Sequence, residues 1–224
     1  MKRLPLLILI LVSGRTLAQT EKVTHDVRAK GIKEKFYVLK SDTNIKEGPY
    51  AAYPRYGSKV LCEGFYKNNS RDSIWSSYDH DGKLEVKYDY THKKLLAYDP
   101  PKYLKEITQF NVISGADTLK TRLDQPPVLM DGTGKLIRLY VAAIRYPAEA
   151  REKNIQGKVI IGITIDTMGH ATNYRIKKFI GGGCDQEALR VVKLIDGDWL
   201  PGKLNGKVVT CEYDLPLSFT LQQD

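Results

Sequence analysis

Three consecutive glycines, at positions 181–183, run into Cys184 and a helix-like pattern, and this stretch is where the sequence looks most capable of chemistry. A glycine loop before a helix can hold a phosphate, and a cysteine at a helix start can be an activated thiol. A phosphate loop needs GxxxxGK(S/T), whereas here Asp185 and Glu187 follow. Two acids in the first turn would repel a phosphate and disfavour a thiolate. We therefore predict the start of a structural helix that buries Ala188, Val191, Val192 and Ile195.

Elsewhere no group of residues has the spacing of a catalytic or metal site. The four histidines lie in separate polar segments, at positions 25, 80, 92 and 170. The GxSxG, HExxH and CxxC patterns are absent from the sequence. Residues 79–82, DHDG, begin like a calcium loop but lack its later ligands, so a hairpin turn is favoured. We expect no enzyme activity, no cofactor and no metal.

The chain is basic, with 35 lysines and arginines against 26 acidic residues and a formal net charge of +9. The basic residues are spread along the sequence, and Lys93-Lys94 and Lys177-Lys178 are only short pairs. A nucleic-acid interface requires clustered basic residues with interleaved aromatic ones. The pattern therefore favours a solvated basic surface and predicts no nucleic-acid partner.

The first 18 residues have the three parts of a secretory signal peptide. Lys2 and Arg3 precede an apolar run over residues 4–12, and small residues lead to Ala18. The apolar run is about half of the ~20 residues that a membrane-spanning helix needs. We therefore expect export with cleavage near Ala18 and Gln19, in preference to an inner-membrane anchor.

Two proline-containing stretches, at residues 100–101 and 125–127, separate regions with different patterns. The predicted organisation is a hairpin domain at residues 19–99, a linker at 100–125 and a second domain at 126–224. The linker is assigned because residues 103–124 have no strong hydrophobic period.

The first region contains an internal repeat. Residues 47–61 and 72–86 align at a shift of 25 residues, which places Tyr50 on Trp75 and Gly57 on Gly82. Each unit consists of an aromatic strand, a glycine turn and a second strand. These residues resemble the MORN-variant repeats, and the resemblance implies an extended array of antiparallel hairpins.

The second region combines helices with long strands. Residues 135–145 have apolar side chains at helical spacing, and a second helix is expected to begin at Pro147. In the last strand, apolar residues at odd positions from Val209 to Phe219 alternate with more polar ones, which predicts a sheet with one buried face. Pro216 has no N–H to donate, so its end of that strand is expected at a sheet edge.

This order of elements is similar to the TonB C-terminal domain over roughly residues 126–221. The residues that carry the similarity are Tyr146, Pro147, Gly157, Gly169, Asp185, Ala188, Leu189, Trp199, Pro201 and Gly202. The resemblance implies an α+β fold, with two helices against a three-stranded antiparallel sheet.

The resemblance also implies a function, namely a periplasmic protein that holds a partner peptide against the free edge of its last strand. In such strand addition, main-chain hydrogen bonds give affinity and alternating side chains give selectivity. By position the docking edge is residues 207–215, with the segment before Tyr146 as a second contributor. The edge residues are Lys207, Val208, Thr210, Glu212 and Asp214. The implied partner is a TonB-dependent outer-membrane transporter, and a homodimer would form through the same edge.

Two features depart from the energy transducers that the family includes. Those proteins have a true membrane helix and a proline-rich spacer, whereas this chain has a removable signal and a repeat domain. Partner binding is therefore implied more directly than energy transduction. The alternative is a structural or scaffold protein of the envelope, with two protein-interaction modules and no role in energy transduction.

The three cysteines of the sequence allow one internal disulfide. If the last two strands pair antiparallel, the end of one lies near the start of the other. Cys184 follows the first of these strands and Cys211 lies early in the second. We therefore expect Cys184 and Cys211 to be bonded or close together, with Cys62 unpaired.

Overall fold

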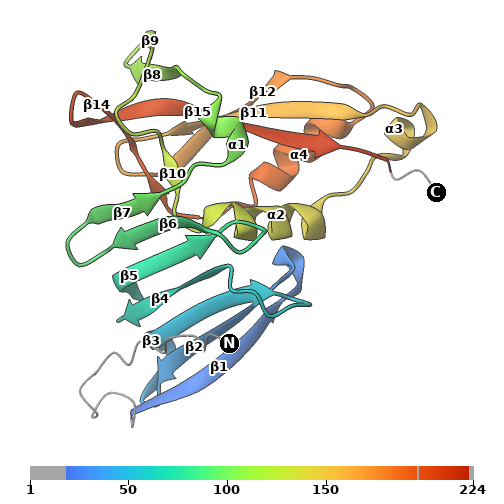
Figure 1. The fold of residues 1–224 in the computed structure, drawn as a ribbon. Coiled ribbons are helices and arrows are strands. Elements are labelled where there is room, and N and C mark those ends of the chain that lie inside the picture. The colour runs from blue at the N-terminus through green and yellow to red at the C-terminus, as the bar shows by residue number, and fades with distance from the viewer. Residues whose placement is uncertain (1–18, 196, 222–224) are drawn as a thin grey trace, which may run out of the picture.

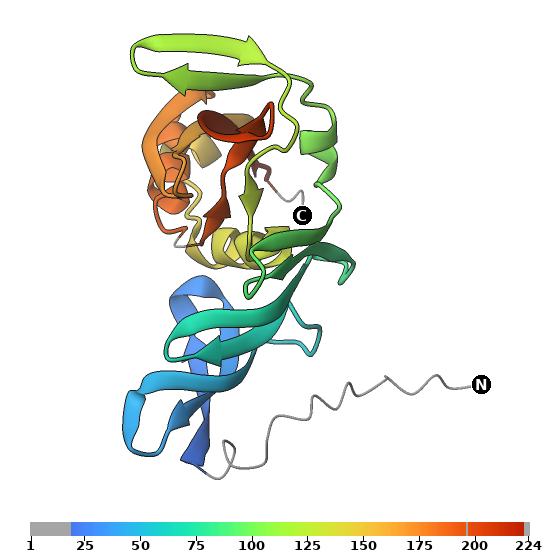
Figure 2. The ribbon, with the colours of Figure 1, turned by 90° about the vertical axis from the view of Figure 1, so that its left-hand side faces the viewer.

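The computed structural model describes residues 19–195 and 197–221. Two antiparallel sheets lie one beyond the other, and helix α2 (Gly132–Ala143) lies between them (Figures 1 and 2). The expected signal peptide, residues 1–18, lies outside the described residues. Within those residues, no helix combines the length and the apolar character that crossing a membrane requires.

The first sheet has seven strands that follow one another in chain order. They are β1 (Thr20–Val27), β2 (Ile32–Leu39), β3 (Asp42–Pro54), β4 (Cys62–Lys67), β5 (Ser70–Tyr78), β6 (Leu84–Asp89) and β7 (Lys94–Tyr98). A 3-10 turn, η2 (Arg28–Lys30), joins β1 to β2. Asn68 and Asn69 adopt positive φ in the β4–β5 turn and Gly82 in the β5–β6 turn, as tight hairpins require. The hairpins are therefore built from local turn residues.

Aromatic residues fill the inner face of this hairpin sheet. Trp75 is buried with Tyr50, and their ring centroids are 5.2 Å apart. A Cβ atom at Gly64 would stand 2.2 Å from the Trp75 ring, so the indole lies directly over the backbone of β4. The Arg71 guanidinium lies over the Trp75 ring, 4.4 Å from the ring centroid.

The second sheet has its strands in the order β12-β11-β15-β8-β9. Its strands are β8 (Phe110–Ser114), β9 (Asp117–Thr121), β11 (Gly157–Ile165), β12 (Ala171–Lys178) and β15 (Lys207–Phe219). β14 (Gly202–Leu204) pairs with the start of β15, and β10 (Val128–Leu129) pairs with β13 (Trp199–Leu200). β11 is the buried centre, because Val159, Ile161, Ile163 and Ile165 are almost fully enclosed.

Residues 100–125, expected to be a linker, are part of this second sheet. They form a short helix, α1 (Lys102–Lys105), and the β8–β9 hairpin. Ile113 and Val112 of β8 pair with Thr210 and Cys211 of β15, and Phe110 is buried in the same core. The hydrophobic period is weak here because four of the five residues of β9 are exposed.

Two further helices cover the second sheet: α3 (Ala148–Glu152) and α4 (Cys184–Val192). As predicted, α4 buries Ala188, Val191 and Val192, whereas Ile195 is only partly buried. Asp185 accepts hydrogen bonds from the N–H groups of Ile180 and Gly181. The glycine stretch thus leads into the N-terminus of α4, and its main chain is held by hydrogen bonds to Asp185 in the first turn of that helix.

Helix α2 docks its first turn against the hairpin sheet. A Cβ atom at Gly134 would stand 2.4 Å from the carbonyl oxygen of Tyr78, so only glycine allows this approach. Thr133 donates from its N–H (2.8 Å) and its hydroxyl (2.5 Å) to the buried carboxylate of Glu85. The two sheets therefore share main-chain and side-chain contacts through α2.

A buried ion cluster strengthens this junction. The Asp131 carboxylate lies 2.6 Å from Arg71 of β5 and 2.7 Å from Lys135 of α2. Burial of Asp131 opposes its ionisation, but the charges of Lys135 and Arg71 outweigh burial and lower its pKa to about 2. Breaking a buried pair leaves an uncompensated charge, so this cluster ties the hairpin sheet to α2.

The expected disulfide is not formed, since Cys62, Cys184 and Cys211 are all buried free thiols. The expectation assumed that β12 and β15 are neighbours. β11 lies between them instead and pairs with both. Cys211 faces Gly202, where an added Cβ would stand 2.7 Å from its sulfur.

Candidate functional site: a groove beside the open edge of the last strand

The first half of the expected docking edge is already engaged within the chain. Lys207 and Val208 pair with β14, because the Asn205-Gly206 turn folds the chain back on itself. Thr210 pairs with Ile113 of β8, so the β8–β9 hairpin takes the place beside β15 that a partner strand would need there. The expectation of a wholly free edge over residues 207–215 is therefore wrong for its first part.

Glu212 and Asp214, the remaining two expected edge residues, use their side chains within the sheet. The Glu212 carboxylate is buried beside Arg175 and Lys177 of β12, and Lys177 also lies 2.7 Å from Asp214. Burial raises the pKa of Glu212, but the Lys177 and Arg175 charges outweigh it and the net pKa is lowered. These two acids hold the outer face of the sheet together, so only their main-chain groups are left for a partner.

The main chain of β15 is open beyond its contact with β8. Pro216 stands opposite Ile160 of β11 and has no N–H. It fits this ladder only where its nitrogen points away from β11, at a position without inter-strand hydrogen bonds. Every second residue of an antiparallel strand points the same way. Asp214 and Ser218 therefore also direct their main-chain groups away from β11, and no strand in the described residues pairs with β15 there.

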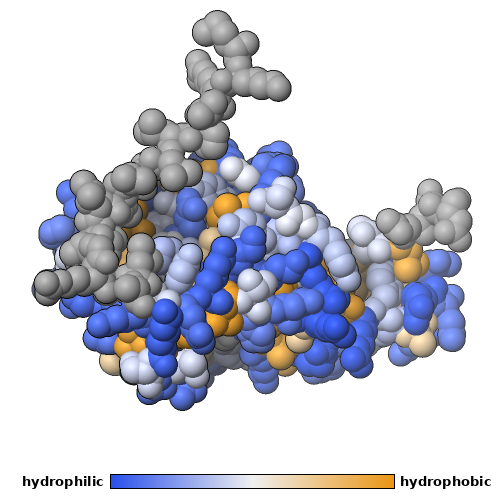
Figure 3. Space-filling view, turned by 90° about the horizontal axis from the view of Figure 1, so that it is seen from below, coloured by the Kyte–Doolittle hydropathy of each residue, from blue (hydrophilic) through white to orange (hydrophobic). Residues whose placement is uncertain are grey.

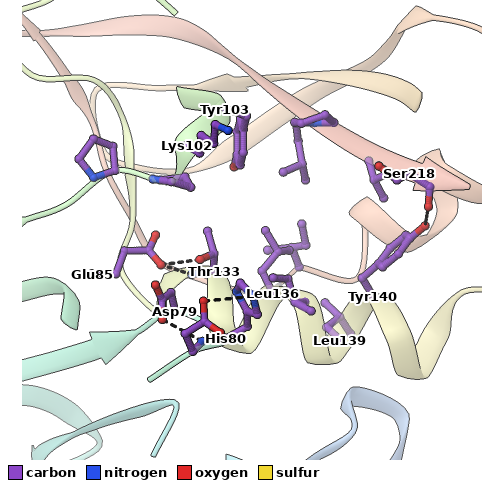
Figure 4. Close-up of a pocket in the computed structure, with 18 of the residues that line it drawn as sticks. Asp79, His80, Glu85, Lys102, Tyr103, Thr133, Leu136, Leu139, Tyr140 and Ser218 are labelled. Atoms are coloured by element: carbon purple, nitrogen blue, oxygen red, sulfur yellow. Dashed lines mark hydrogen bonds and ion pairs between the residues drawn. The ribbon is translucent and has the colours of Figure 1, made fainter. Parts of the chain in front are cut away.

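A groove of about 630 Å³ lies beside this open edge. β15 forms one wall with Leu215, Pro216, Leu217 and Ser218, and α2 forms the opposite wall (Figure 4). The α2 residues are Leu136, Ile137, Leu139, Tyr140 and Val141, and the end of α4 adds Val191, Val192 and Ile195. The β5–β6 turn, Leu84 and Glu85 of β6, Thr133 of α2, residues 99–103 and Lys105 complete the lining. The groove is in the size range of ligand pockets and has a largely apolar lining.

Two tyrosines bracket the open edge. The Tyr103 hydroxyl of α1 lies 2.6 Å from the Tyr213 hydroxyl, and the Tyr140 hydroxyl of α2 donates to the Ser218 carbonyl at 2.5 Å. Burial raises the pKa of Tyr103 and of Tyr140 to about 12. Both hydroxyls are therefore neutral near pH 7, and Tyr140 holds a main-chain acceptor of the edge.

Charged residues form the mouth of the groove on the side of the hairpin sheet. Lys83 and Lys105 both contact the Asp99 carboxylate, the latter at 2.6 Å. Hydrogen bonds from Lys105 and Lys83 lower the pKa of Asp99 to about 2. Burial raises the pKa of Glu85, which bonds to Thr133 deeper in the groove. The polar mouth is thus mostly paired within itself, and the apolar floor is what a ligand would meet.

The residues of the family motif have structural positions. A Cβ atom at Gly169 would stand 2.0 Å from the carbonyl oxygen of Trp199, and the Trp199 ring lies 4.9 Å from that of Tyr213. The Tyr146 hydroxyl donates to the Ile155 carbonyl at 2.6 Å, and Gly157 has a φ of 149°. Pro147 precedes α3, Pro201 accepts a hydrogen bond from Gln125 at 3.2 Å, Gly202 begins β14, and Ala188 and Leu189 lie on α4.

Burial makes two of the cysteine thiols weak nucleophiles. Burial raises the pKa of the Cys62 thiol to about 12 and that of Cys211 to about 11. Across residues 19–195 and 197–221, no group of acidic, histidine or cysteine side chains has the geometry of a metal site. What the arrangement offers is an unpaired strand edge beside an apolar groove.

The sequence did not indicate Tyr103, Leu136 or Ile137 as site residues. Tyr103 lay in the segment assigned as a linker, Leu136 was expected on the buried side of a helix, and Ile137 had no expected role. One sequence prediction did indicate the α2 wall of the groove. The segment before Tyr146 was expected to contribute to partner docking, and α2 with Tyr140 lies in that segment.

Comparison with protein-family models matches residues 142–221 to the Gram-negative bacterial TonB protein C-terminal family, a protein-interaction family of the Gram-negative envelope. This segment contains α3, β11, β12, α4 and β15, so the open edge belongs to it, whereas most of α2 precedes it. No curated protein and no solved structure matches the chain.

Proposed function

We propose that this chain is an exported TonB-like binding protein of the cell envelope that docks a partner protein by strand addition along residues 214–218 of β15. The observation that carries the proposal is the open main-chain edge of β15 beside the groove, within the segment that matches the family model. An unpaired strand edge is a template for pairing with another chain.

The proposed edge is shorter than the expected one and lies nearer the C-terminus. β14 and β8 engage Lys207, Val208 and Thr210, so a partner strand is confined to the stretch that begins near Asp214. The proposed partner is an extended segment of a TonB-dependent outer-membrane transporter. A homodimer formed by strand pairing would need the same five residues, and partner and second copy would therefore compete.

The location of the protein is part of the proposal. We propose that residues 1–18 are a signal peptide cleaved near Ala18 and that the mature chain acts in the periplasm. The proposed MORN-variant hairpin module spans residues 19–99 and the binding module 126–224. N-terminal sequencing of the exported protein tests this, because an uncleaved N-terminus would support an inner-membrane anchor instead.

The strand-addition experiment uses the full mature chain with Ser218→Pro. Ser218 is exposed, and proline there removes one main-chain donor from the open edge without touching the ladder with β11. Ser218→Ala is the matched control. Envelope proteins captured by each form are identified by mass spectrometry. We expect outer-membrane transporters with the wild type and with Ser218→Ala, and their loss with Ser218→Pro; equal capture by all three contradicts strand addition.

The observation that would favour the alternative, an envelope scaffold with two interaction modules, is two exposed apolar residues of the hairpin region, Tyr56 in the β3–β4 loop and Ile74 on β5. Tyr56 is 85% exposed and Ile74 is 47% exposed. The face of the molecule in Figure 3 is nevertheless mainly hydrophilic, with apolar residues scattered among charged ones. Single exposed apolar residues are normal on a monomer surface. Capture of partners that Tyr56→Ser abolishes and Ser218→Pro leaves intact would support the scaffold.

A further inference from the structure

The groove is built by both sheets together. Leu136, Ile137 and Leu217 come from the part of the chain that holds α2 and β15, whereas Leu84 and residues 99–105 come from the hairpin sheet and the segment after it. Figure 4 shows Tyr103 above the cavity, with α2 and the Asp79–His80 turn below it. Any chain segment that pairs with residues 214–218 of β15 must also lie against the opposite side of the groove, which α2 and the hairpin sheet form.

The side chains of such a segment would alternate between two environments. In an extended strand, successive side chains point to opposite faces of the sheet. Those on the outer face would meet the Glu212, Lys177 and Asp214 cluster and water. Those on the inner face would share the side of Leu215 and Leu217 and enter the groove.

We infer that the groove binds bulky apolar side chains at alternate positions of the docking peptide, so that α2 and the hairpin sheet select the sequence of the partner. This inference rests on the proposed strand addition. Five residues of strand span about 16 Å and place two or three side chains on one face. A charged side chain at these positions would be desolvated among Leu136, Leu139 and Val192 without a partner, which is costly. The peptide class is therefore an extended segment with apolar residues two positions apart and polar residues between them.

The wall of the groove favours a peptide over an acyl chain. The N–H and carbonyl of Asp214, the carbonyl of Pro216 and the N–H of Ser218 point toward the space that a ligand would occupy, whereas the Ser218 carbonyl already accepts the Tyr140 hydroxyl. An acyl chain would displace water from these groups without replacing its hydrogen bonds, and that loss costs free energy for each group left unpaired. A peptide main chain supplies donors and acceptors at the matching spacing.

The test begins with a phage-displayed library of random dodecapeptides, selected on the full mature chain. The most enriched peptide is synthesised with a fluorophore, and its Kd is measured by anisotropy. Ile137→Lys is the groove variant, because Ile137 lines the groove and is already 37% exposed, so the fold is expected to tolerate lysine. Leu119→Lys on β9, at a residue 59% exposed outside the groove, is the matched control. Circular dichroism melts check that each variant is folded.

We expect enriched peptides with apolar residues two apart, at least a tenfold higher Kd with Ile137→Lys, an unchanged Kd with Leu119→Lys, and no binding with Ser218→Pro. If Ser218→Pro abolishes binding but Ile137→Lys does not change it, strand addition stands and the groove inference is overturned. If binding is insensitive to Ser218→Pro, strand addition itself fails. If no peptide is enriched and dansyl-undecanoic acid binds the wild type but not Ile137→Lys, the groove holds an acyl ligand and the inference is overturned.

Discussion

The two sheets of this protein pair their strands in opposite ways. In the hairpin sheet each strand pairs with the next one along the chain, from β1 to β7. In the second sheet β15 pairs with β11 on one side and with β8, from a segment before α2, on the other. The first sheet is therefore assembled from local turns, and the second depends on segments that are distant in the sequence.

This difference determines where each sheet leaves an edge. In the part of the chain that the structure describes, a meander in chain order leaves its first and last strands, here β1 and β7, with a neighbouring strand on one side only. The second sheet has a strand, β15, whose one side is occupied only in part, and helix α2 and the hairpin sheet stand opposite the open part. The binding edge is thus a product of the non-local arrangement, and disrupting the junction between the sheets should disturb it most.

The largest expected effect is at that junction. Asp131→Ala leaves the buried charge of Lys135 without its partner and leaves Arg71 with only the more distant Asp198 carboxylate, at 3.5 Å. Loss of one member of a buried pair costs about 3–5 kcal/mol. We expect the free energy of unfolding in urea to fall by that amount. Asp117→Ala on the exposed strand β9 is the control and should change stability by less than about 0.5 kcal/mol. Equal effects of the two substitutions would mean that the cluster does not join the sheets.

The second prediction concerns the segment that the sequence assigned to a linker. Phe110 of β8 is 7% exposed and packs in the core of the second sheet. Phe110→Ala is expected to cost about 3 kcal/mol, at the lower end for a buried phenylalanine because β8 lies near the edge and can relax. Chemical denaturation measures this loss. Leu119→Ala on the neighbouring strand is the control, and a loss below about 1 kcal/mol for Phe110→Ala would restore the linker.

The contrast between the sheets also explains what the sequence could predict. The hairpins were predictable because each depends on a turn residue such as Gly82 between two short strands, and α4 because its apolar residues have a clear helical period. The β8–β9 hairpin was not predictable, because the exposed strand β9 has no hydrophobic period and β15, the partner of β8, follows three helices later in the chain. The same non-local order placed β11 between β12 and β15, the two strands that the expected Cys184–Cys211 pairing assumed to be neighbours. Of the candidate site, the sequence indicated only the last strand. The opposite wall of the groove could not be predicted, because it forms only when α2 docks between the two sheets.

The third prediction uses the pH dependence of the junction. The pKa of Asp131 is about 2 in the folded protein, whereas an unperturbed aspartate, as in the unfolded chain, has a pKa of about 3.8. Ionisation of Asp131 therefore stabilises the folded protein. Its contribution is fully present above pH ~4 and is lost as pH falls toward 2. We expect the stability advantage of the wild type over Asp131→Asn to shrink by about 2 kcal/mol between pH 5 and pH 2. Denaturation of both proteins across this range measures it, and a constant advantage would show that Asp131 is not held ionised by Arg71 and Lys135.

The smallest expected effect is at the edge itself, where Tyr140→Phe removes the hydrogen bond from the hydroxyl to the Ser218 carbonyl and keeps the ring. One such bond contributes about 1 kcal/mol, and water can reach the freed carbonyl, so the loss of stability should not exceed this value. Tyr37→Phe in the hairpin sheet is the control. The hydroxyl of Tyr140 holds an acceptor that an incoming strand would need, so Tyr140→Phe should leave the affinity for a selected peptide equal to or higher than that of the wild type. A lower affinity would mean that the Tyr140 hydroxyl contacts the peptide directly. The peptide would then not pair with the Ser218 carbonyl.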